Sequence, residues 1–244
     1  MAEKYEHRFY RLWSKSGDLV SFEVTIKETG LFVSAQADLS KQTEDAISQT
    51  RQDIEGYIRL HPKFKTTLTP LPDDKNAPQI VRQMLKASLK SGVGPMAAVA
   101  GAIAEEVGNR LLKETSQVIV ENGGDIFISS KTTRRIGIFA GESPLSNKLA
   151  VEISAKDTPC GICTSSATVG PSLSFGKADA ALIYSRNCAL ADAAATAVGN
   201  IVKSKDDIKK GLKLAEKIKG VEGALIIIKD TFGAWGSIKI VDIT

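Results

Sequence analysis

Two runs of very small side chains constrain how this chain can fold more than any other feature of its sequence. One run extends from Met96 to Ala104, and the other extends from Ala189 to Ala197 with a single Asp192 and a single Thr196 among its alanines. A helix with so little side-chain bulk lets another backbone or a ligand approach it closely. The second run is typical of a buried helix.

The composition is that of an ordinary folded protein with a substantial core. The 244 residues are 43% hydrophobic and 25% charged, which is enough apolar material for one domain over residues 1–244 or for two interlocked lobes. The only candidate boundary is a shift in composition near residue 90. The net charge of +4 owes much to lysines between Lys203 and Lys219. Their helical spacing indicates a solvated helix face, since a nucleic-acid surface normally interleaves arginines and aromatics.

The sequence predicts a cytoplasmic protein with no membrane segment. The N-terminal residues have no apolar signal region, and no segment offers eighteen or more consecutive apolar residues. Three cysteines, an odd number, suit a reducing compartment better than a disulfide framework.

Alternating apolar residues predict that the chain opens with a β-hairpin. Its strands are Val20–Ile26 and Leu31–Ala35, joined at Glu28–Gly30. Apolar spacing then predicts one helix beginning near Thr43 and another after Pro78.

Further along, apolar runs predict strands at 118–120, 149–153, 180–184, 224–228 and 238–240, of which 118–120 and 180–184 are expected to be buried. A second hairpin is expected to join 126–128 to 136–138, and a turn is expected at Gly233. Ser204 and Asp207 predict the start of a helix that ends at Gly220. The expected fold is α+β or α/β, with mixed β-sheets flanked by helices.

Asp192 and Thr196 are a candidate metal site. Residues four apart lie on one helix face, so a carboxylate and a hydroxyl oxygen can converge on one hard cation. Oxygen donors in an incomplete protein shell suit Mg²⁺, which water and phosphates complete. The alternative is that Asp192 caps the helix while Thr196 only packs.

Asn122-Gly123-Gly124-Asp125 follows a predicted buried strand and is a candidate phosphate-binding turn. Two glycines let the backbone pass close to a ligand and expose N–H groups that can bind phosphate oxygens. In isolation, a plain hairpin turn explains this tetrapeptide equally well.

The segment from Cys160 to Ser166 combines a C-x-x-C pattern with three hydroxyls in a predicted loop. A zinc site or an iron–sulfur cluster would need two further ligands, and the candidates are Cys188 and the distant His7 and His61. A redox pair and ordinary loop cysteines are the other interpretations. Two histidines leave little support for a Ser-His triad around Ser172, Ser174 or Tyr184.

Taken together, these motifs resemble the ApbE family of flavin transferases. The span from about Ser91 to Gly199 carries Ala100-Gly101, the Gly-Gly-Asp turn, Thr164-Ser165-Ser166 and the helix from Ala191 to Ala197 in the family's order. Members of that family bind FAD and Mg²⁺ and transfer FMN to a threonine of a partner protein. The resemblance therefore implies a flavin-nucleotide site and an acceptor protein as partner. It implies metal ligands at Asp192 and Thr196, and cofactor contacts at Gly101, Glu105, Gly123, Gly124, Asp125, Thr164 and Ser165.

The chain also departs from the family's pattern. Ala100 stands where the family has lysine, Glu105 stands where it has aspartate, and the family's His-containing stretch is absent between Ser166 and Asp192. The segment from Val93 to Ala102 looks closest to a shorter branch of ApbE-like proteins. Because the departures affect catalysis more than ligand binding, the sequence leaves two alternatives. One is Mg²⁺-dependent FMN transfer, and the other is non-catalytic binding of a flavin or another nucleotide.

Overall fold

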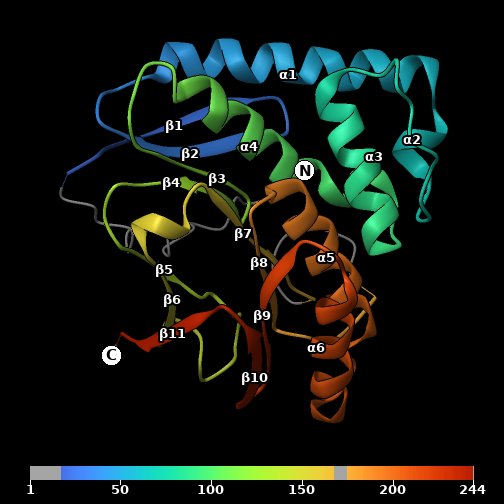
Figure 1. The fold of residues 1–244 in the computed structure, drawn as a ribbon, viewed down its shortest axis with the longest axis vertical. Helices are drawn as coiled ribbons and strands as arrows, with labels where there is room; N and C mark the ends of the chain where they lie inside the picture. Colours follow the sequence, from blue (N-terminus) through green and yellow to red (C-terminus); the bar gives the residue numbers. More distant parts are fainter. Residues whose placement is uncertain (1–17, 168–174, 244) are drawn as a thin grey trace, which may run out of the picture.

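Alternating apolar side chains in the first two strands begin a large antiparallel sheet that runs through the whole protein. The computed structural model describes residues 18–167 and 175–243. Its strands form an eight-stranded sheet in the order β1-β2-β3-β4-β7-β8-β9-β10 and a three-stranded sheet in the order β11-β6-β5. Helices cover one face of the large sheet, and the small sheet lies at its other face (Figure 1). The predicted α+β class is confirmed, with antiparallel pairing between all of these strands.

The strands are β1 (Val20–Ile26), β2 (Thr29–Ala35), β3 (Val118–Asn122), β4 (Asp125–Ser129), β5 (Arg134–Gly137), β6 (Leu149–Ile153), β7 (Cys160–Ser165), β8 (Ala180–Ser185), β9 (Val221–Ile228), β10 (Thr231–Gly236) and β11 (Lys239–Asp242). The α-helices are α1 (Ser40–Leu60), α2 (Lys63–Thr66), α3 (Gln79–Ser91), α4 (Val99–Leu111), α5 (Cys188–Ile201) and α6 (Ile208–Lys217). Short 3₁₀ turns are η2 (Pro95–Ala98), η3 (Ala155–Asp157) and η4 (Lys205–Asp207).

Two hydrophobic cores lie on opposite faces of the large sheet. The helix-side core takes Val120, Cys163 and Ala181 from the sheet together with the buried faces of the helices. The second core packs residues such as Ile128 and Leu182 against the small sheet. Successive residues of a strand point to opposite faces, so each central strand contributes to both cores.

Local signals account for several helix ends. Gly92 follows α3 with φ of 74°, the left-handed conformation that glycine adopts without strain. The side chain of Asn187 accepts a hydrogen bond from the Leu190 N–H at the start of α5. The predicted capping box at Ser204 and Asp207 is present. None of the helices in the described ranges is both long enough and apolar enough to cross a membrane.

Three expectations from the sequence are wrong. Strands β4 and β5 do not form a hairpin, because β4 belongs to the large sheet and β5 to the small one. Gly233 is not at a turn but inside β10, and the chain reverses at 229–230 instead. The Cys160–Ser165 segment is not a loop but the central strand β7. Helix α5 packs directly on this strand, so small and polar residues occupy it. The run of β-branched residues that usually indicates a strand is therefore missing.

Close packing of α5 against its neighbours explains the glycines around it. A Cβ on Gly161 of β7 would lie 2.4 Å from the Cys188 Cα, and a Cβ on Gly101 of α4 would lie 2.5 Å from the Cys188 carbonyl oxygen. Both contacts are with backbone, which cannot rotate out of the way as a flexible side chain can. Thus, β7 and α4 approach the first turn of α5 so closely that only glycine fits.

We expect Gly161→Ala to destabilise the protein by about 1–3 kcal/mol, because the added methyl overpacks a backbone contact. Gly56→Ala is the matched control, since Gly56 lies within α1 and its nearest neighbour would be 3.7 Å away. In a helix that change should stabilise by roughly 0.5–1 kcal/mol. Urea unfolding of the two variants measures both effects, and equal stability of Gly161→Ala and the parent protein would refute the packing argument.

Candidate functional site

Two carboxylates from distant parts of the chain meet between the large sheet and α5. Asp125 begins β4, and Phe127 two residues later belongs to the helix-side core, so Asp125 points to the same face. Asp192 lies in the first turns of α5. Burial, and then the nearby charge of Asp125, raise the pKa of Asp192 well above its ordinary value. A pair of this kind repels itself unless a proton or a cation neutralises it.

Helix α4 fixes the position of Asp192. The backbone N–H of Gly101 donates a 2.9 Å hydrogen bond to Asp192 Oδ2. The space where a Gly101 side chain would lie is filled by the Cys188 carbonyl and by the Asp192 Cβ. The small residues at the start of α4 therefore admit another backbone at this point. Direct contact between Gly101 and a cofactor stays a prediction.

Glu105, one turn further along α4, caps the beginning of α5. Its Oε2 accepts hydrogen bonds from the N–H groups of Cys188, at 2.7 Å, and Ala189, at 3.4 Å. Its Oε1 accepts from Asn187 Nδ2 at 3.4 Å. Burial raises the pKa of Glu105, while the two backbone N–H groups oppose that shift. This carboxylate thus supplements the Asn187 cap and joins the two helices. A cofactor contact at Glu105 stays a prediction.

The Gly-Gly-Asp motif forms a tight hairpin between β3 and β4. Gly123 and Gly124 have φ of 68° and 108°, and Asn122 is paired directly with Asp125. Two successive positive φ angles are the reason for two glycines in a two-residue hairpin. Asn122 Nδ2 donates to the carbonyl of Ala100 at 3.1 Å. The hairpin is therefore tied to the start of α4, and the Asp125 side chain is held near α5.

A polar stripe runs along the otherwise buried helix α5. Asp192, Thr196 and Asn200 recur at every fourth residue, and all three are partly exposed between buried residues. They therefore share one face. Asn200 Oδ1 accepts a hydrogen bond from the Phe175 N–H at 2.9 Å. This bond holds the backbone at Phe175 beside the end of α5. The Asn200 position was missed in the sequence, although the same four-residue spacing could have revealed it.

The structure separates Thr164 from Ser165. Ser165 pairs with Ala181 of the helix-side core, and a Cβ on Gly199 of α5 would lie 3.2 Å from Ser165 Oγ. Thr164 pairs with Leu182 and points to the opposite face of the sheet. Ser165 is consequently on the side of the sheet that carries Asp192, and Thr164 is not.

The cysteines do not form a C-x-x-C site. Cys160 is buried in the small-sheet core and Cys163 in the helix-side core, because they lie three residues apart on one strand. Burial raises the pKa of Cys160 to about 12. Cys163 Sγ instead lies 3.6 Å from Cys188 Sγ. Within residues 18–167 and 175–243, no three His, Cys, Asp or Glu side chains are grouped to hold a metal. His7, Ser172 and Ser174 lie outside the described residues.

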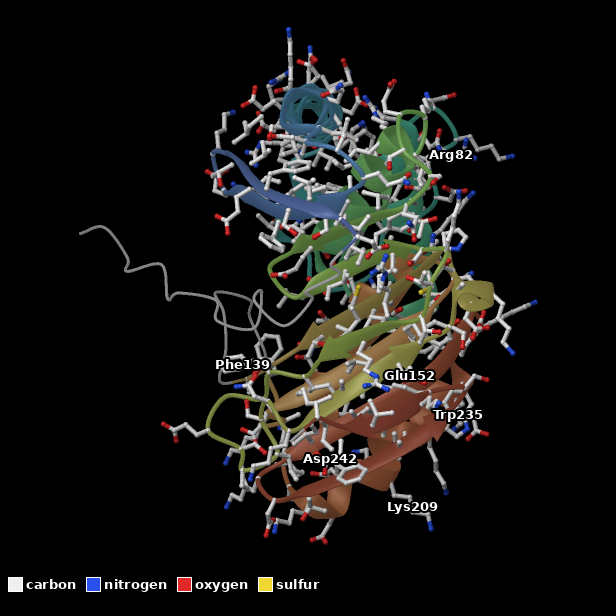
Figure 2. All side chains as sticks on the ribbon, turned by 90° about the vertical axis from the view of Figure 1, so that its left-hand side faces the viewer. Arg82, Phe139, Glu152, Lys209, Trp235 and Asp242 are labelled. Carbon is white, nitrogen blue, oxygen red and sulfur yellow. The ribbon has the colours of Figure 1, made fainter. Side chains whose placement is uncertain are left out.

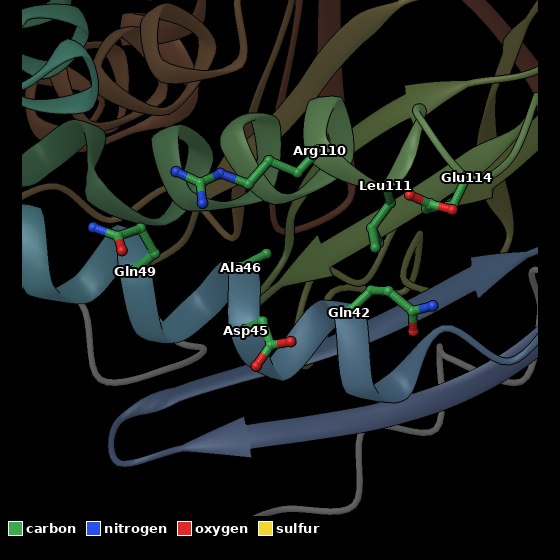
Figure 3. A pocket seen from close by; sticks show the side chains of 7 residues that line it. All are labelled: Gln42, Asp45, Ala46, Gln49, Arg110, Leu111 and Glu114. Carbon is green, nitrogen blue, oxygen red and sulfur yellow. The ribbon is translucent and has the colours of Figure 1, made fainter.

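A separate hollow lies between α1 and α4, with a volume of about 370 Å³ (Figure 3). Gln42, Asp45 and Gln49 line it from α1, and Arg110 and Glu114 line it from the end of α4 and beyond. Arg110 is nine residues from Gly101, which corresponds to about 14 Å along a helix. The hollow is therefore distinct from the carboxylate pair.

We expect Glu105→Ala to destabilise the protein by about 0.5–2 kcal/mol, the usual cost of losing a helix cap. Glu105→Gln should cost less because its amide oxygen still accepts a hydrogen bond. Glu106→Ala is the matched control, since Glu106 lies on the same helix and forms an i,i+4 ion pair with Arg110, an interaction of modest stability. Chemical denaturation of the three variants tests this order. If Glu105→Ala and Glu106→Ala are equally stable, Glu105 does not hold α5.

The raised pKa of Asp192 predicts an unusual effect of removing its charge. An acid whose pKa is higher in the folded state opposes folding when ionised, so its contribution to stability declines as pH rises through the folded pKa. We therefore expect metal-free Asp192→Asn to melt at a higher temperature than the parent protein at neutral pH. The gain should disappear near the unfolded pKa of about 3.9. Asp206→Asn, which removes an exposed carboxylate, should show no such gain.

Comparison with known proteins identifies the family to which this chain belongs. The family described as AbpE bacteria matches residues 11–233. A UPF0280 protein of Methanosarcina acetivorans is 43% identical over 197 residues, covering 80% of this chain and 78% of the relative. A UPF0280 protein of Methanocaldococcus jannaschii is 38% identical over 221 residues, covering 88% of this chain and 90% of the relative.

Solved structures confirm the ApbE-like fold. The flavinyl transferase ApbE of Pseudomonas stutzeri aligns with a TM-score of 0.58 at 13% identity, over 89% of this chain and 94% of that one. The ApbE protein of Thermotoga maritima aligns with a TM-score of 0.52 at 14% identity, over 91% and 96% of the two chains. The chain is therefore a member of the AbpE bacteria family and is related throughout most of its length to the UPF0280 proteins.

Proposed function

We propose that this protein binds a flavin nucleotide, FAD, together with Mg²⁺ in the layer between the β3–β4 turn and α5. The observation that carries the proposal is the meeting of Asp125 and Asp192, where burial and mutual repulsion raise the pKa of Asp192. A divalent cation relieves that repulsion and binds oxygen ligands by preference. Thr196, one turn along the same face of α5, supplies a third oxygen.

The donor set fits Mg²⁺ better than a softer metal. Two carboxylates and one hydroxyl are hard oxygen donors, and too few to complete an octahedral shell, so water and phosphate oxygens would fill it. The thiols of Cys163 and Cys188 lie nearby, but burial raises the pKa of Cys163 well above its ordinary value, which disfavours the thiolate that metals bind.

FMN transfer from FAD to a threonine of an acceptor protein is the activity that this site would serve, by analogy with the flavin transferases that share the fold. Bound Mg²⁺ would neutralise negative charge on the pyrophosphate. The chain's own contribution would be to hold Asp192 through the Gly101 N–H and to hold the first turn of α5 through Glu105. The nucleophile would be the threonine hydroxyl of the acceptor, which would form a bond to the FMN phosphorus while the pyrophosphate bond breaks and AMP leaves with the oxygen of that bond.

A second candidate is flavin or nucleotide binding without transfer, and Ala100 favours it. This residue stands where the resemblance places a lysine, and its partly exposed methyl carries no charge. Losing one group that stabilises charge in the transition state typically costs about 10²–10³ in rate. We therefore propose that the protein binds FAD and transfers FMN weakly at most.

We expect FAD to bind only when Mg²⁺ is present, and we expect Asp192→Ala to abolish this Mg²⁺-dependent binding. Native mass spectrometry with flavin absorbance measures binding. Incubation with a threonine-bearing peptide, followed by a search for the FMN mass increment, measures transfer, which we expect to be weak or undetectable. Asp206→Ala is the control for a lost exposed carboxylate. FAD binding that persists equally in EDTA and in Asp192→Ala would rule out the metal site, and robust transfer would rule out the non-catalytic alternative.

A further inference from the structure

Three of the four sheet edges carry charged side chains, and one does not. The edges are β1 and β10 of the large sheet and β11 and β5 of the small one. Charged residues occur in β1 at Glu23, in β5 at Arg134 and Arg135, and in β11 at Lys239 and Asp242. The edge strand β10 reads Thr-Phe-Gly-Ala-Trp-Gly, with no charge and no proline. Charges and prolines are the usual means of preventing an edge strand from pairing with another chain.

The outer edge of β10 is also regular and open. It pairs with β9 from Thr231 opposite Ile228 to Gly236 opposite Gly223 without a register shift, so no bulge twists it away. Within residues 18–167 and 175–243, no strand pairs with its other side. Trp235 lies at the margin of the molecule, on the lower strands of Figure 2.

The two faces of β10 differ. Gly233 faces α6, since a Cβ there would lie 2.6 Å from Ile208. Thr231 and Trp235 share that half-buried face. Phe232, Ala234 and Gly236 face the other way and are exposed, and Phe232 leaves 46% of its surface to solvent. The open edge is thus flanked by an exposed aromatic ring, as is common where another strand packs alongside.

We propose that β10 is a homodimer interface, in which it pairs antiparallel with β10 of a second copy about a two-fold axis at Gly233. Residues opposite each other in a sheet must point to the same face. This register places Phe232 opposite Ala234 and Thr231 opposite Trp235, so each aromatic ring meets a smaller side chain. Asp230 meets Gly236, so no like charges face each other. The pairing joins the two large sheets into one.

Two features favour a second copy as the occupant. The strand carries no charge, and its large side chains lie opposite smaller ones in the symmetric pairing. It offers no charged group with which to select a different extended peptide. Symmetric pairing also closes the assembly, because, among the strands of the described residues, the edges left on the joined sheet are the two β1 strands with their Glu23 residues. The proposed dimer interface is separate from the flavin site, since β7, β8 and β9 lie between β10 and β4.

Analytical ultracentrifugation of the purified full chain over a wide range of concentrations tests the proposal. We expect a species of twice the 26.1 kDa chain mass. Ala234→Lys and Phe232→Lys each place two like charges near the two-fold axis, and each should raise the dimer dissociation constant roughly ten-fold or more. Val20→Lys is the matched control, because Val20 is 47% exposed on the opposite edge strand. It should leave the dimer intact.

Two results would overturn the homodimer: a parent protein that is monomeric at all concentrations, or a dimer that survives both lysine substitutions. Circular dichroism checks that the variants fold. If they do not, hydrogen exchange on the parent protein replaces them, since protection of the outward-facing β10 amides should rise with protein concentration. Protection that does not depend on concentration, or that appears only when an acceptor protein is added, would also contradict the proposal.

Discussion

The candidate site depends on how closely β7 and α4 approach the first turn of α5. Gly161 and Gly101 leave no room for a side chain beside Cys188, so the three backbones are in direct contact. This contact lets the Gly101 N–H reach Asp192 and lets Glu105 reach the N–H groups of Cys188 and Ala189. A single added methyl at either glycine would displace α5, and with it the carboxylate that we assign to the metal.

The same packing sets the electrostatics of the site. Asp192 is carried on an alanine-rich helix that lies flat on the sheet, so it is desolvated and is held near Asp125. The backbone N–H groups of Gly101 and Ala100 oppose the rise in the pKa of Asp192. The structure therefore concentrates negative charge at a point where backbone N–H groups only partly compensate it, an arrangement suited to a cation that arrives with its ligand.

The middle of the large sheet and its β10 edge have different roles. The β3–β4 turn and α5 provide the site near its middle, while β10 ends the sheet with an uncharged strand. Because α6 covers only one face of β10, the exposed Phe232 lies beside backbone groups that no strand in the described ranges pairs with. A dimer formed there would stabilise the sheet without altering access to the carboxylate pair.

Periodic segments were predictable from the sequence because their signals are local. The first hairpin, α3, the α6 capping box and the strand β3 all follow from spacing or from a cap within a few residues. The alanine-rich run indicated the helix with Asp192 and Thr196, whereas the order of the motifs was recognised only through the resemblance to the ApbE family. Strand β7 was not predicted, because Cys160–Ser165 lacks the bulky β-branched pattern. Helix α5 lies so close to this strand that only small residues such as glycine and cysteine fit. The false β4–β5 hairpin arose because alternation reveals strands but does not reveal which sheet each one joins.

The sequence by itself therefore determined that helices combine with β-sheets, left α+β and α/β open, and supplied the family resemblance and the residue types available for chemistry. Only the tertiary structure decided which of those residues meet. It brought Asp125 to Asp192 and turned Glu105 toward the start of α5. It also placed Thr164 and Ser165 on opposite faces of β7. The physical reason is that helix and strand periodicity act over a few residues. The pairs Asp125/Asp192 and Glu105/Cys188 are at least 67 residues apart in sequence, and they come together where backbones pack against glycine.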